Sequence, residues 1–288
     1  MQPSQLSERI RRSIDKMSEG ARAVAEFVLE RPEDVAMLPA ARVAERLGIS
    51  ESTVTRFAVL LGYKGYPAFR RDLQSDVRRN LMPLQRLALP DVPEHAPRRT
   101  LSAAFRQDIE NILRTEQNVA EADLHRAVAL LSNARIIHVV GLRASFGLAH
   151  TLYFQLQQML GNVVLCDTNR GEGLDALVGI GVQDVVVCIS FPRHATMTVA
   201  AAQFAHKRHA KVIAITDGPL SPIAAQAEIL FSVNTSILNV TTSLAGGFSL
   251  INALCAEMLL MNRNRAARSL EQVEEVVHAT GLLHQSPG

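Results

Sequence analysis

Short hydroxyl and basic side chains recur between residues 50 and 64, at a spacing that suits contact with DNA. On an expected helix over residues 51–61, the positions that are not apolar hold Ser52, Thr53, Thr55 and Arg56, with Ser50 just before them and Lys64 just after. Hydroxyl and guanidinium groups hydrogen-bond to base edges and to phosphates in the major groove. We therefore expect a DNA-binding surface formed by Ser50, Ser52, Thr53, Thr55, Arg56 and Lys64.

The surrounding pattern predicts the two helices that would present this surface. A first helix is expected over residues 40–47, Gly48 suits a backbone turn with positive φ, and Ser50 is a good N-cap for the second helix. Ala44 is small enough to let two crossing helices touch. Five apolar residues fall on the faces to be buried: Val43, Leu47, Ile49, Val54 and Phe57. Glycine between two amphipathic helices is common in other hairpins, so the joint fit of all these positions is what predicts a helix-turn-helix.

A second group of polar residues follows two expected strands and suits an anionic small molecule. The segment GLRAS, residues 141–145, and the segment SFPRHAT, residues 190–196, each lie between a strand and a helix. Hydroxyls, guanidinium groups and helix N-termini bind anions at such positions. The expected effector residues are Gly141, Arg143, Ser145, Ser190, Arg193, His194 and Thr196. The alternative is that the hydroxyls are only helix caps and that Arg193 and His194 are solvated loop residues.

Alternating strands and helices predict how these segments are positioned. Short β-branched apolar runs are expected as strands at 135–140, 163–166, 184–190, 211–216 and 229–233, with helices between them such as 146–160. Strands buried on both faces and separated by helices indicate a doubly wound parallel sheet, which binds ligands at the carboxyl ends of its strands. Helices are also expected over residues 101–119, 123–132, 244–261 and 265–278.

The domain plan follows from these patterns. We expect an all-α helix-turn-helix domain over residues 1–80, a linker with four prolines over 81–100, and an α/β doubly wound domain over 101–288. Residues 1–80 hold 14 Lys and Arg against 11 Asp and Glu, so the small basic excess of the chain lies with the expected DNA-binding domain.

Composition excludes several other classes of protein. The chain is 48% hydrophobic and 20% charged, which is ordinary for a globular protein. Its three cysteines are far apart without CxxC spacing, so we expect neither a metal site nor a disulfide framework, and no cofactor. No P-loop, HExxH motif or nucleophile elbow is present. No apolar leader or charge-free run of 18 apolar residues occurs, so we expect a cytoplasmic protein without a membrane partner.

With both halves considered, the chain resembles the RpiR family of bacterial transcriptional regulators. The resemblance is most specific over ISESTVTRFAVLLGYKGYPAFRRDL, residues 49–73, and KVIAITDGPLSPIAAQAEILFSV, residues 211–233. It implies that the second domain is a sugar isomerase (SIS) domain that binds phosphorylated sugars or related metabolites, through Ser145, Ser190 and Thr196. The second loop departs from the usual Ser-x-Ser-Gly-x-Thr pattern, since the second Ser and the Gly are missing, and Arg193 is placed to replace the lost anion contacts.

Three functions remain open at this point. The first is a regulator that binds a double-stranded DNA operator and responds to a small anionic metabolite, either a sugar phosphate or a sugar acid. The second is a sugar-phosphate isomerase with an accessory N-terminal domain, although an isomerase has no use for a DNA-binding domain. The third is a regulator whose SIS domain only dimerises. Because one helix-turn-helix rarely binds specifically alone, we expect a homodimer or homotetramer.

Overall fold

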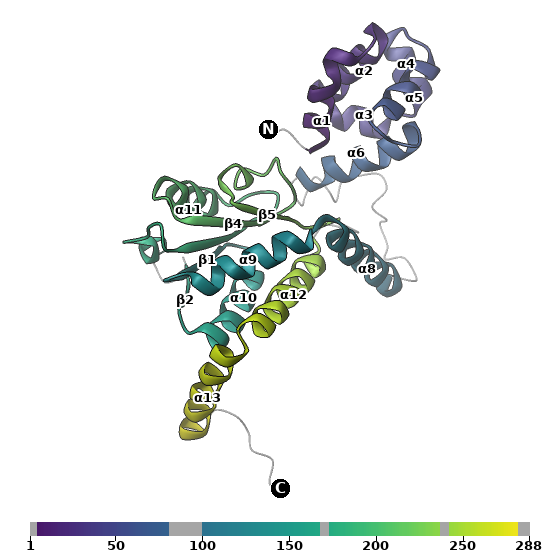
Figure 1. The fold of residues 1–288 in the computed structure, drawn as a ribbon. Coiled ribbons are helices and arrows are strands. Elements are labelled where there is room, and N and C mark those ends of the chain that lie inside the picture. The colour runs from purple at the N-terminus through teal and green to yellow at the C-terminus, as the bar shows by residue number, and fades with distance from the viewer. Residues whose placement is uncertain (1–4, 81–99, 168–172, 237–241, 282–288) are drawn as a thin grey trace. The chain divides into compact units, whose positions relative to one another are not determined.

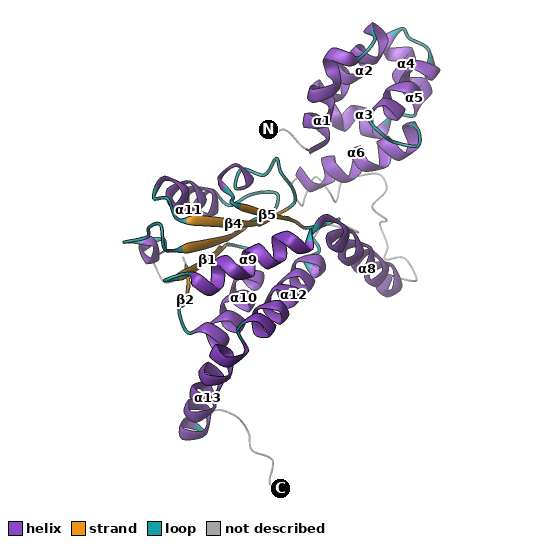
Figure 2. Cartoon of the chain, viewed as in Figure 1, coloured by secondary structure: helices purple, strands orange, loops and turns teal. Residues whose placement is uncertain are grey.

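The computed structural model describes residues 5–80, 100–167, 173–236 and 242–281 (Figure 1). The chain divides into two compact units, the first comprising Met1–Gln107 with Ser236–Thr242, and the second Asp108–Thr235 with Ser243–Gly288. The first unit is all helical, whereas the second carries every strand of the described residues (Figure 2). The linker expected over residues 81–100 lies outside the described residues except for Thr100.

Among the described residues, six α-helices and one short 3-10 helix lie wholly within the N-terminal unit. They are α1 (Gln5–Ser13), η1 (Ile14–Lys16), α2 (Glu19–Glu30), α3 (Pro32–Met37), α4 (Ala40–Leu47), α5 (Glu51–Leu60) and α6 (Tyr66–Asn80). Their apolar faces meet in one core, in which the rings of Phe57 and Phe69 pack edge to face with centroids 5.3 Å apart. The helix-turn-helix prediction is confirmed, with the second helix ending one residue earlier than expected.

The turn between α4 and α5 has the geometry that its residues predict. Gly48 is left-handed with φ +65°, and the N–H of Ile49 donates to the carbonyl of Ala44 at 3.0 Å. Ser50 caps α5, because its hydroxyl accepts a hydrogen bond from the N–H of Thr53 at 3.2 Å. Such a cap contributes about 1 kcal/mol to helix stability.

A five-stranded parallel sheet forms the centre of the second unit. Its strands are β1 (Ile137–Gly141), β2 (Val163–Leu165), β3 (Val185–Ile189), β4 (Lys211–Thr216) and β5 (Ile229–Ser232), in the order β2-β1-β3-β4-β5. All neighbouring strands are parallel, as the doubly wound prediction requires. Each expected strand is present within two residues of its predicted bounds.

Helices cover both faces of this sheet. On one face lie α9 (Glu121–Asn133), α10 (Ser145–Leu160) and α12 (Ala245–Met261), whose apolar residues share a core with Ile137 and Val139 of β1. On the other face, α11 (Thr196–Lys207) packs on Val140, Val186 and Val212. Successive strand residues point to opposite faces, so the near-continuous apolar runs follow directly from burial on both sides.

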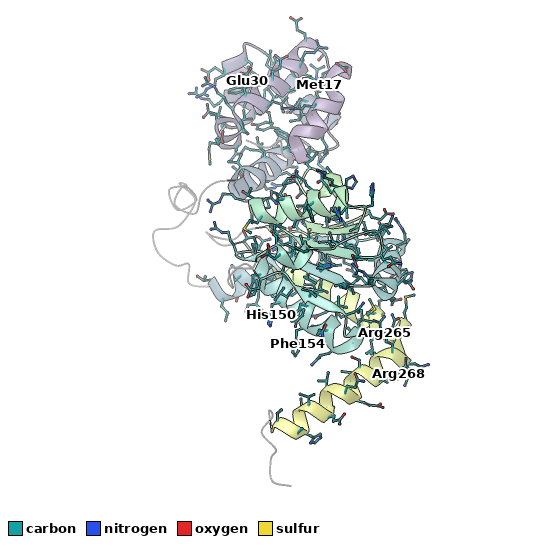
Figure 3. All side chains as sticks on the ribbon, turned by 90° about the vertical axis from the view of Figure 1, so that its left-hand side faces the viewer. Met17, Glu30, His150, Phe154, Arg265 and Arg268 are labelled. Atoms are coloured by element: carbon teal, nitrogen blue, oxygen red, sulfur yellow. The ribbon has the colours of Figure 1, made fainter. Side chains whose placement is uncertain are left out.

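The remaining helical segments of the second unit are two 3-10 turns, one further helix and the part of another helix from Asp108 onward. The 3-10 turns η3 (Asp175–Leu177) and η4 (Ala224–Gln226) precede β3 and β5. Helix α8 (Thr100–Asn118) leads into α9. Helix α13 (Arg263–Thr280), which carries Arg265 and Arg268, follows α12 and contacts α10 (Figure 3). Within the described residues, no single helix is long and apolar enough to cross a membrane, and α12 with α13 meet that length and composition only as a pair bent by 105°.

Candidate functional site

Helix α5 buries one face and exposes another that carries short polar and basic side chains. Val54, Phe57 and Ala58 are buried in the N-terminal core. Ser52 and Arg56 are exposed, whereas Thr53 and Thr55 are half-buried. The exposed face therefore offers a hydroxyl and a guanidinium group one turn apart, a combination that suits the major groove.

Hydrogen bonds organise the start of this face. The hydroxyl of Ser50 lies 2.8 Å from that of Ser52 and 2.9 Å from that of Thr53. One turn later, Nη2 of Arg56 donates to the Thr53 hydroxyl at 3.3 Å. Thr53 thus orients Arg56 and helps to cap the helix.

Gly20 is a residue of this region that the sequence pattern did not single out. It lies in the first turn of α2, and a Cβ built on it would lie 2.9 Å from Cγ2 of Thr53. A larger residue would push α5 away from α2. Only the contact between segments 33 residues apart in sequence identifies Gly20, so no local signal marks it.

The loop after α5 holds Lys64, which is exposed. Its neighbour Tyr63 donates a hydrogen bond to Asp72 of α6 and accepts one from Arg9 of α1 at 3.2 Å, while Arg9 also donates to the carbonyl of Leu61. Burial is the main cause that raises the pKa of Tyr63, and the hydrogen bond to Asp72 is the second, so the phenol stays protonated. Arg9 and Tyr63 therefore fix the chain at the end of α5.

The second candidate site lies where strands β1, β3 and β4 end. Gly141 pairs with Ile189, and Ile189 pairs with Ile215, so the residues after all three strands lie at one level of the sheet. The N–H of Ser190 extends this pairing by donating to the carbonyl of Ile215 at 3.1 Å. In the order β2-β1-β3-β4-β5, the chain passes from β1 to β2 on one side and then returns to β3 on the other side of β1. The point between β1 and β3, where the strand order reverses, is where doubly wound proteins bind ligands.

Gly141 brings the start of α10 close to the sheet. A Cβ on Gly141 would lie 2.8 Å from Cβ of Ala149 and 2.8 Å from the carbonyl oxygen of Ser145. Ser145 is the first residue of α10 and is buried. The glycine thus serves the packing of helix on strand, and through it positions the hydroxyl of Ser145.

His194 joins the second loop to the end of β4. Its Nδ1 lies 3.2 Å from the hydroxyl of Ser190, and its Nε2 lies 3.6 Å from Oδ1 of Asp217. Thr216 donates to Asp217 at 3.0 Å, and its hydroxyl also lies 2.7 Å from that of Ser221. Burial lowers the pKa of His194, although the charge of Asp217 acts in the opposite direction. The alternative that His194 is a solvated loop residue is wrong, because its side chain is only 13% exposed.

Three expected effector residues lie at the surface around this polar network. Arg143, with a left-handed φ of 57°, and Arg193 are exposed, and Thr196 is exposed as the first residue of α11. Two residues of the turn after β4, Asp217 and Ser221, join the network although neither was among the expected effector residues. Thr198, in the first turn of α11, is buried, and its hydroxyl has no hydrogen-bond partner within the described chain.

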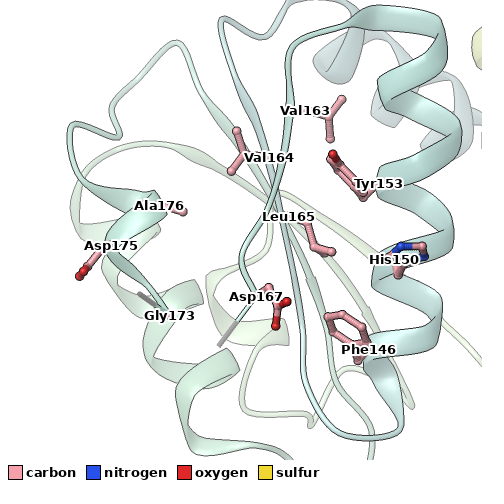
Figure 4. A pocket seen from close by; sticks show the side chains of 10 residues that line it. All are labelled: Phe146, His150, Tyr153, Val163, Val164, Leu165, Asp167, Gly173, Asp175 and Ala176. Carbon is pink, nitrogen blue, oxygen red and sulfur yellow. The ribbon is translucent and has the colours of Figure 1, made fainter. Parts of the chain in front are cut away.

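A separate cavity of about 1090 Å³ opens between α10 and the edge strand β2 (Figure 4). Its lining combines apolar and aromatic side chains with one histidine and two carboxylates: Phe146, His150, Tyr153, Val163, Val164, Leu165, Asp167, Gly173, Asp175 and Ala176. None of the expected effector residues lines it. Among the residues that the structure describes, no cluster of three His, Cys, Asp or Glu side chains could hold a metal ion.

Two known families match the two units. Residues 4–80 match the family described as "Helix-turn-helix domain, rpiR family", and residues 130–257 match the SIS domain. Together the two matches cover most of the chain and contain both candidate sites.

Individual relatives match this chain along most of their own length. The chain is 24% identical to the HTH-type transcriptional regulator HexR of Escherichia coli over 274 residues, which is 94% of this chain and 93% of that protein. It is 27% identical to HexR of Pseudomonas aeruginosa over 230 residues, 79% of this chain and 78% of the relative. In fold it resembles the solved Vibrio vulnificus NanR protein complexed with ManNAc-6P, with a TM-score of 0.60, 20% identity and coverage of 98% and 100%.

Proposed function

Because the chain belongs to the RpiR family of helix-turn-helix regulators with an SIS domain, we propose that a small anionic metabolite controls its affinity for a DNA operator. The metabolite is a sugar phosphate or a sugar acid, and it binds where β1, β3 and β4 end. The protein acts in the cytoplasm, where the DNA is, and has no catalytic turnover of its own.

The observation that carries the DNA-binding role is the division of α5 into two faces. Its apolar residues are buried, while Ser52 and Arg56 are exposed and Thr53 and Thr55 flank them. We propose that Thr53, Thr55 and Arg56 approach base edges, and that Ser50, Ser52 and Lys64 lie nearer to phosphates.

The polar strand ends support the choice of an anion as the effector. Ser145 supplies a hydroxyl at the first residue of α10, and Ser190 supplies one directly after β3, in the loop that leads to α11. Arg143 and Arg193 add positive charge at the surface. The solved NanR protein of the same fold was complexed with ManNAc-6P, a phosphorylated sugar. We assign Gly141, His194 and Thr196 to the same pocket, Gly141 as the glycine that lets α10 approach.

Two or more copies act together in this proposal. A homodimer places two helix-turn-helix units on half-sites about 34–36 Å apart, or a multiple of that distance, and a homotetramer is two such dimers. The operator is therefore expected to have two-fold symmetry.

Selection of genomic DNA by the purified protein, followed by sequencing, tests the DNA-binding role. We expect enrichment of a symmetric site, with affinity that changes when a sugar phosphate or sugar acid is added. Enrichment no greater than for random DNA would contradict it. Conversion of one of these metabolites by the protein would instead support the isomerase alternative.

A further inference from the structure

The imidazole of His194 bridges the residues that follow β3 and β4. Its Nδ1 lies 3.2 Å from the hydroxyl of Ser190, and its Nε2 lies 3.6 Å from Oδ1 of Asp217. Ser190 is buried and the side chain of His194 is 13% exposed, so water does not readily replace either contact. The proton on each ring nitrogen therefore decides what the hydroxyl of Ser190 can offer to a ligand.

Hydrogen bonds hold Asp217 in place beside Nε2 of the ring. The hydroxyl of Thr216 donates to Oδ1 of Asp217 at 3.0 Å and lies 2.7 Å from the hydroxyl of Ser221. Thr216 and Ser221 are both buried. Because a carboxylate only accepts, Asp217 favours a proton on Nε2 of His194, whether the ring as a whole is neutral or charged.

The neutral ring uses the proton of Ser190. With its own proton on Nε2, the ring has a lone pair on Nδ1, which accepts from the Ser190 hydroxyl. Oγ of Ser190 then has only lone pairs to offer to a ligand. Lone pairs suit a hydrogen-bond donor and repel the oxygen of an anion.

The protonated ring reverses this bond. Nδ1–H now donates to Oγ of Ser190, so the hydroxyl proton of Ser190 is free to point toward an oxygen of an anion. The ring also carries a positive charge, and a charge attracts an anion more strongly in a water-poor site than in bulk water. Protonation of His194 thus converts Ser190 from an acceptor into a donor.

We propose that the effector anion binds together with one proton, which His194 takes up between Ser190 and Asp217. The inference deepens the proposed function and rests on it, because it concerns the same site at the strand ends. An anion that prefers the protonated ring must raise the proton affinity of His194 by the same factor, since coupling between two ligands is reciprocal.

The charges around His194 agree with a coupled proton. Burial lowers the pKa of His194 and the charge of Asp217 raises it, so the free ring is mostly neutral at pH 7. Among the described residues, Asp217 is the charged group that acts on the ring, whereas Arg143 and Arg193 are exposed on the two loops. An anion adds a second negative charge. Its affinity is therefore complete below the pKa of the free ring and is lost as pH rises through the pKa of the anion-bound ring.

A pH titration of isotope-labelled histidines in the full chain, followed by NMR, tests the proposal. Sulfate stands in for a phosphate group and acetate for a carboxylate, and neither changes its charge between about pH 6 and 8, so any proton taken up belongs to the protein. Sodium chloride at the same ionic strength controls for screening. We expect at least one of the two anions to raise the pKa of His194 by about one unit, which is a tenfold gain in affinity. The comparison also distinguishes a sugar phosphate from a sugar acid.

Two variants separate this role from a purely structural one. His194→Asn, whose spectrum also identifies the His194 signal by its absence, places a group that does not titrate near the position of Nδ1. Its anion affinity should be equal at pH 6 and pH 8. Asp217→Asn can donate to Nε2, so the neutral ring can carry its proton on Nδ1 and binding should no longer require proton uptake. His206→Asn, at an exposed site, should keep the wild-type pH dependence.

An equal pKa of His194 in chloride, sulfate and acetate would overturn the inference. If the backbone amide of Ser190 still responded to one of the anions, the proposed effector site would stand without the coupled proton. If neither residue responded, the result would count against both. Anion binding by His194→Asn that kept the wild-type pH dependence would also overturn the inference, because another group would then take up the proton.

Discussion

Arg56 is the side chain on which the proposed DNA recognition depends most. It is exposed on α5 and held by the hydroxyl of Thr53. Replacing it with alanine removes a planar set of donors that lysine or a hydroxyl cannot reproduce. We expect Arg56→Ala to lose about 1–3 kcal/mol of operator affinity and to relax specificity at one base pair.

Lys64→Ala is the matched control for this substitution. As a phosphate contact, its loss should weaken binding to all sequences alike and make the salt dependence of binding shallower by about one unit. Titrations of the operator and of a scrambled duplex at several salt concentrations separate the two effects. Operator binding by Arg56→Ala with wild-type affinity and specificity would show that recognition uses another face.

His138 makes the stability of the SIS unit depend on pH. It lies buried in β1, where burial lowers its pKa, a nearby Asp184 raises it and Arg135 lowers it again. In the unfolded chain its pKa returns to about 6.5, so the unfolded state binds the proton first as pH falls. The stability contributed by the neutral imidazole is therefore complete above about pH 6.5 and is lost as pH falls toward the folded pKa.

Urea denaturation at pH 8 and at pH 5.5 measures this dependence. The variant His138→Leu should lose less stability between the two pH values than the wild type. The exposed His206→Gln should keep the wild-type difference. An identical loss in His138→Leu and in the wild type would assign the acid sensitivity to other groups.

At the scale of elements, the close approach of α10 to β1 positions Ser145. We expect Gly141→Ala to destabilise the SIS unit by about 1–3 kcal/mol, because the new Cβ would overlap Ala149 and the carbonyl of Ser145. It should also weaken effector binding, since the start of α10 must move. Gly181→Ala is the control, as a Cβ there meets nothing within 4 Å. Thermal unfolding with and without effector measures both effects, and equal stability of the two variants would refute the packing argument.

Local patterns were sufficient to predict the elements. The three central strands are short β-branched runs buried on both faces, and Gly48 with Ser50 marks the turn between α4 and α5. Each of these signals lies within a few residues of the structure that it predicts, which is why their bounds agree closely.

Contacts between distant segments could not be predicted in this way. Asp217 reaches His194 because β3 and β4 are neighbours, and Gly20 faces Thr53 because α2 crosses α5. Two side chains of α8 likewise bond to residues more than 100 positions away, because Asp108 accepts from Ser243 and Thr115 accepts from the N–H of Asn234. Burial of His194 follows from the same neighbours, so residue type alone suggested a solvated side chain.

At the scale of the whole molecule, regulation requires that the effector binds two arrangements of the protein unequally. The N-terminal unit and the SIS unit each have their own core, so DNA binding and effector binding can be measured separately. An effector at the proposed site, at the ends of β1 and β3, would contact the first residues of α10 and α11, which pack on the sheet that carries α12. A shift of these helices is the means by which the proposed site would change the spacing of the DNA-binding units.

The most direct test of this account is a titration of the selected operator with the full chain, with and without sugar phosphates and sugar acids, in the wild type and in two variants. We predict that at least one compound changes the operator affinity of the wild type. Ser145→Ala and Arg193→Ala should bind the operator normally without effector and respond much less when it is present. A full wild-type response in both variants would contradict the proposed site, and an operator affinity that none of these compounds alters would contradict control by such a metabolite.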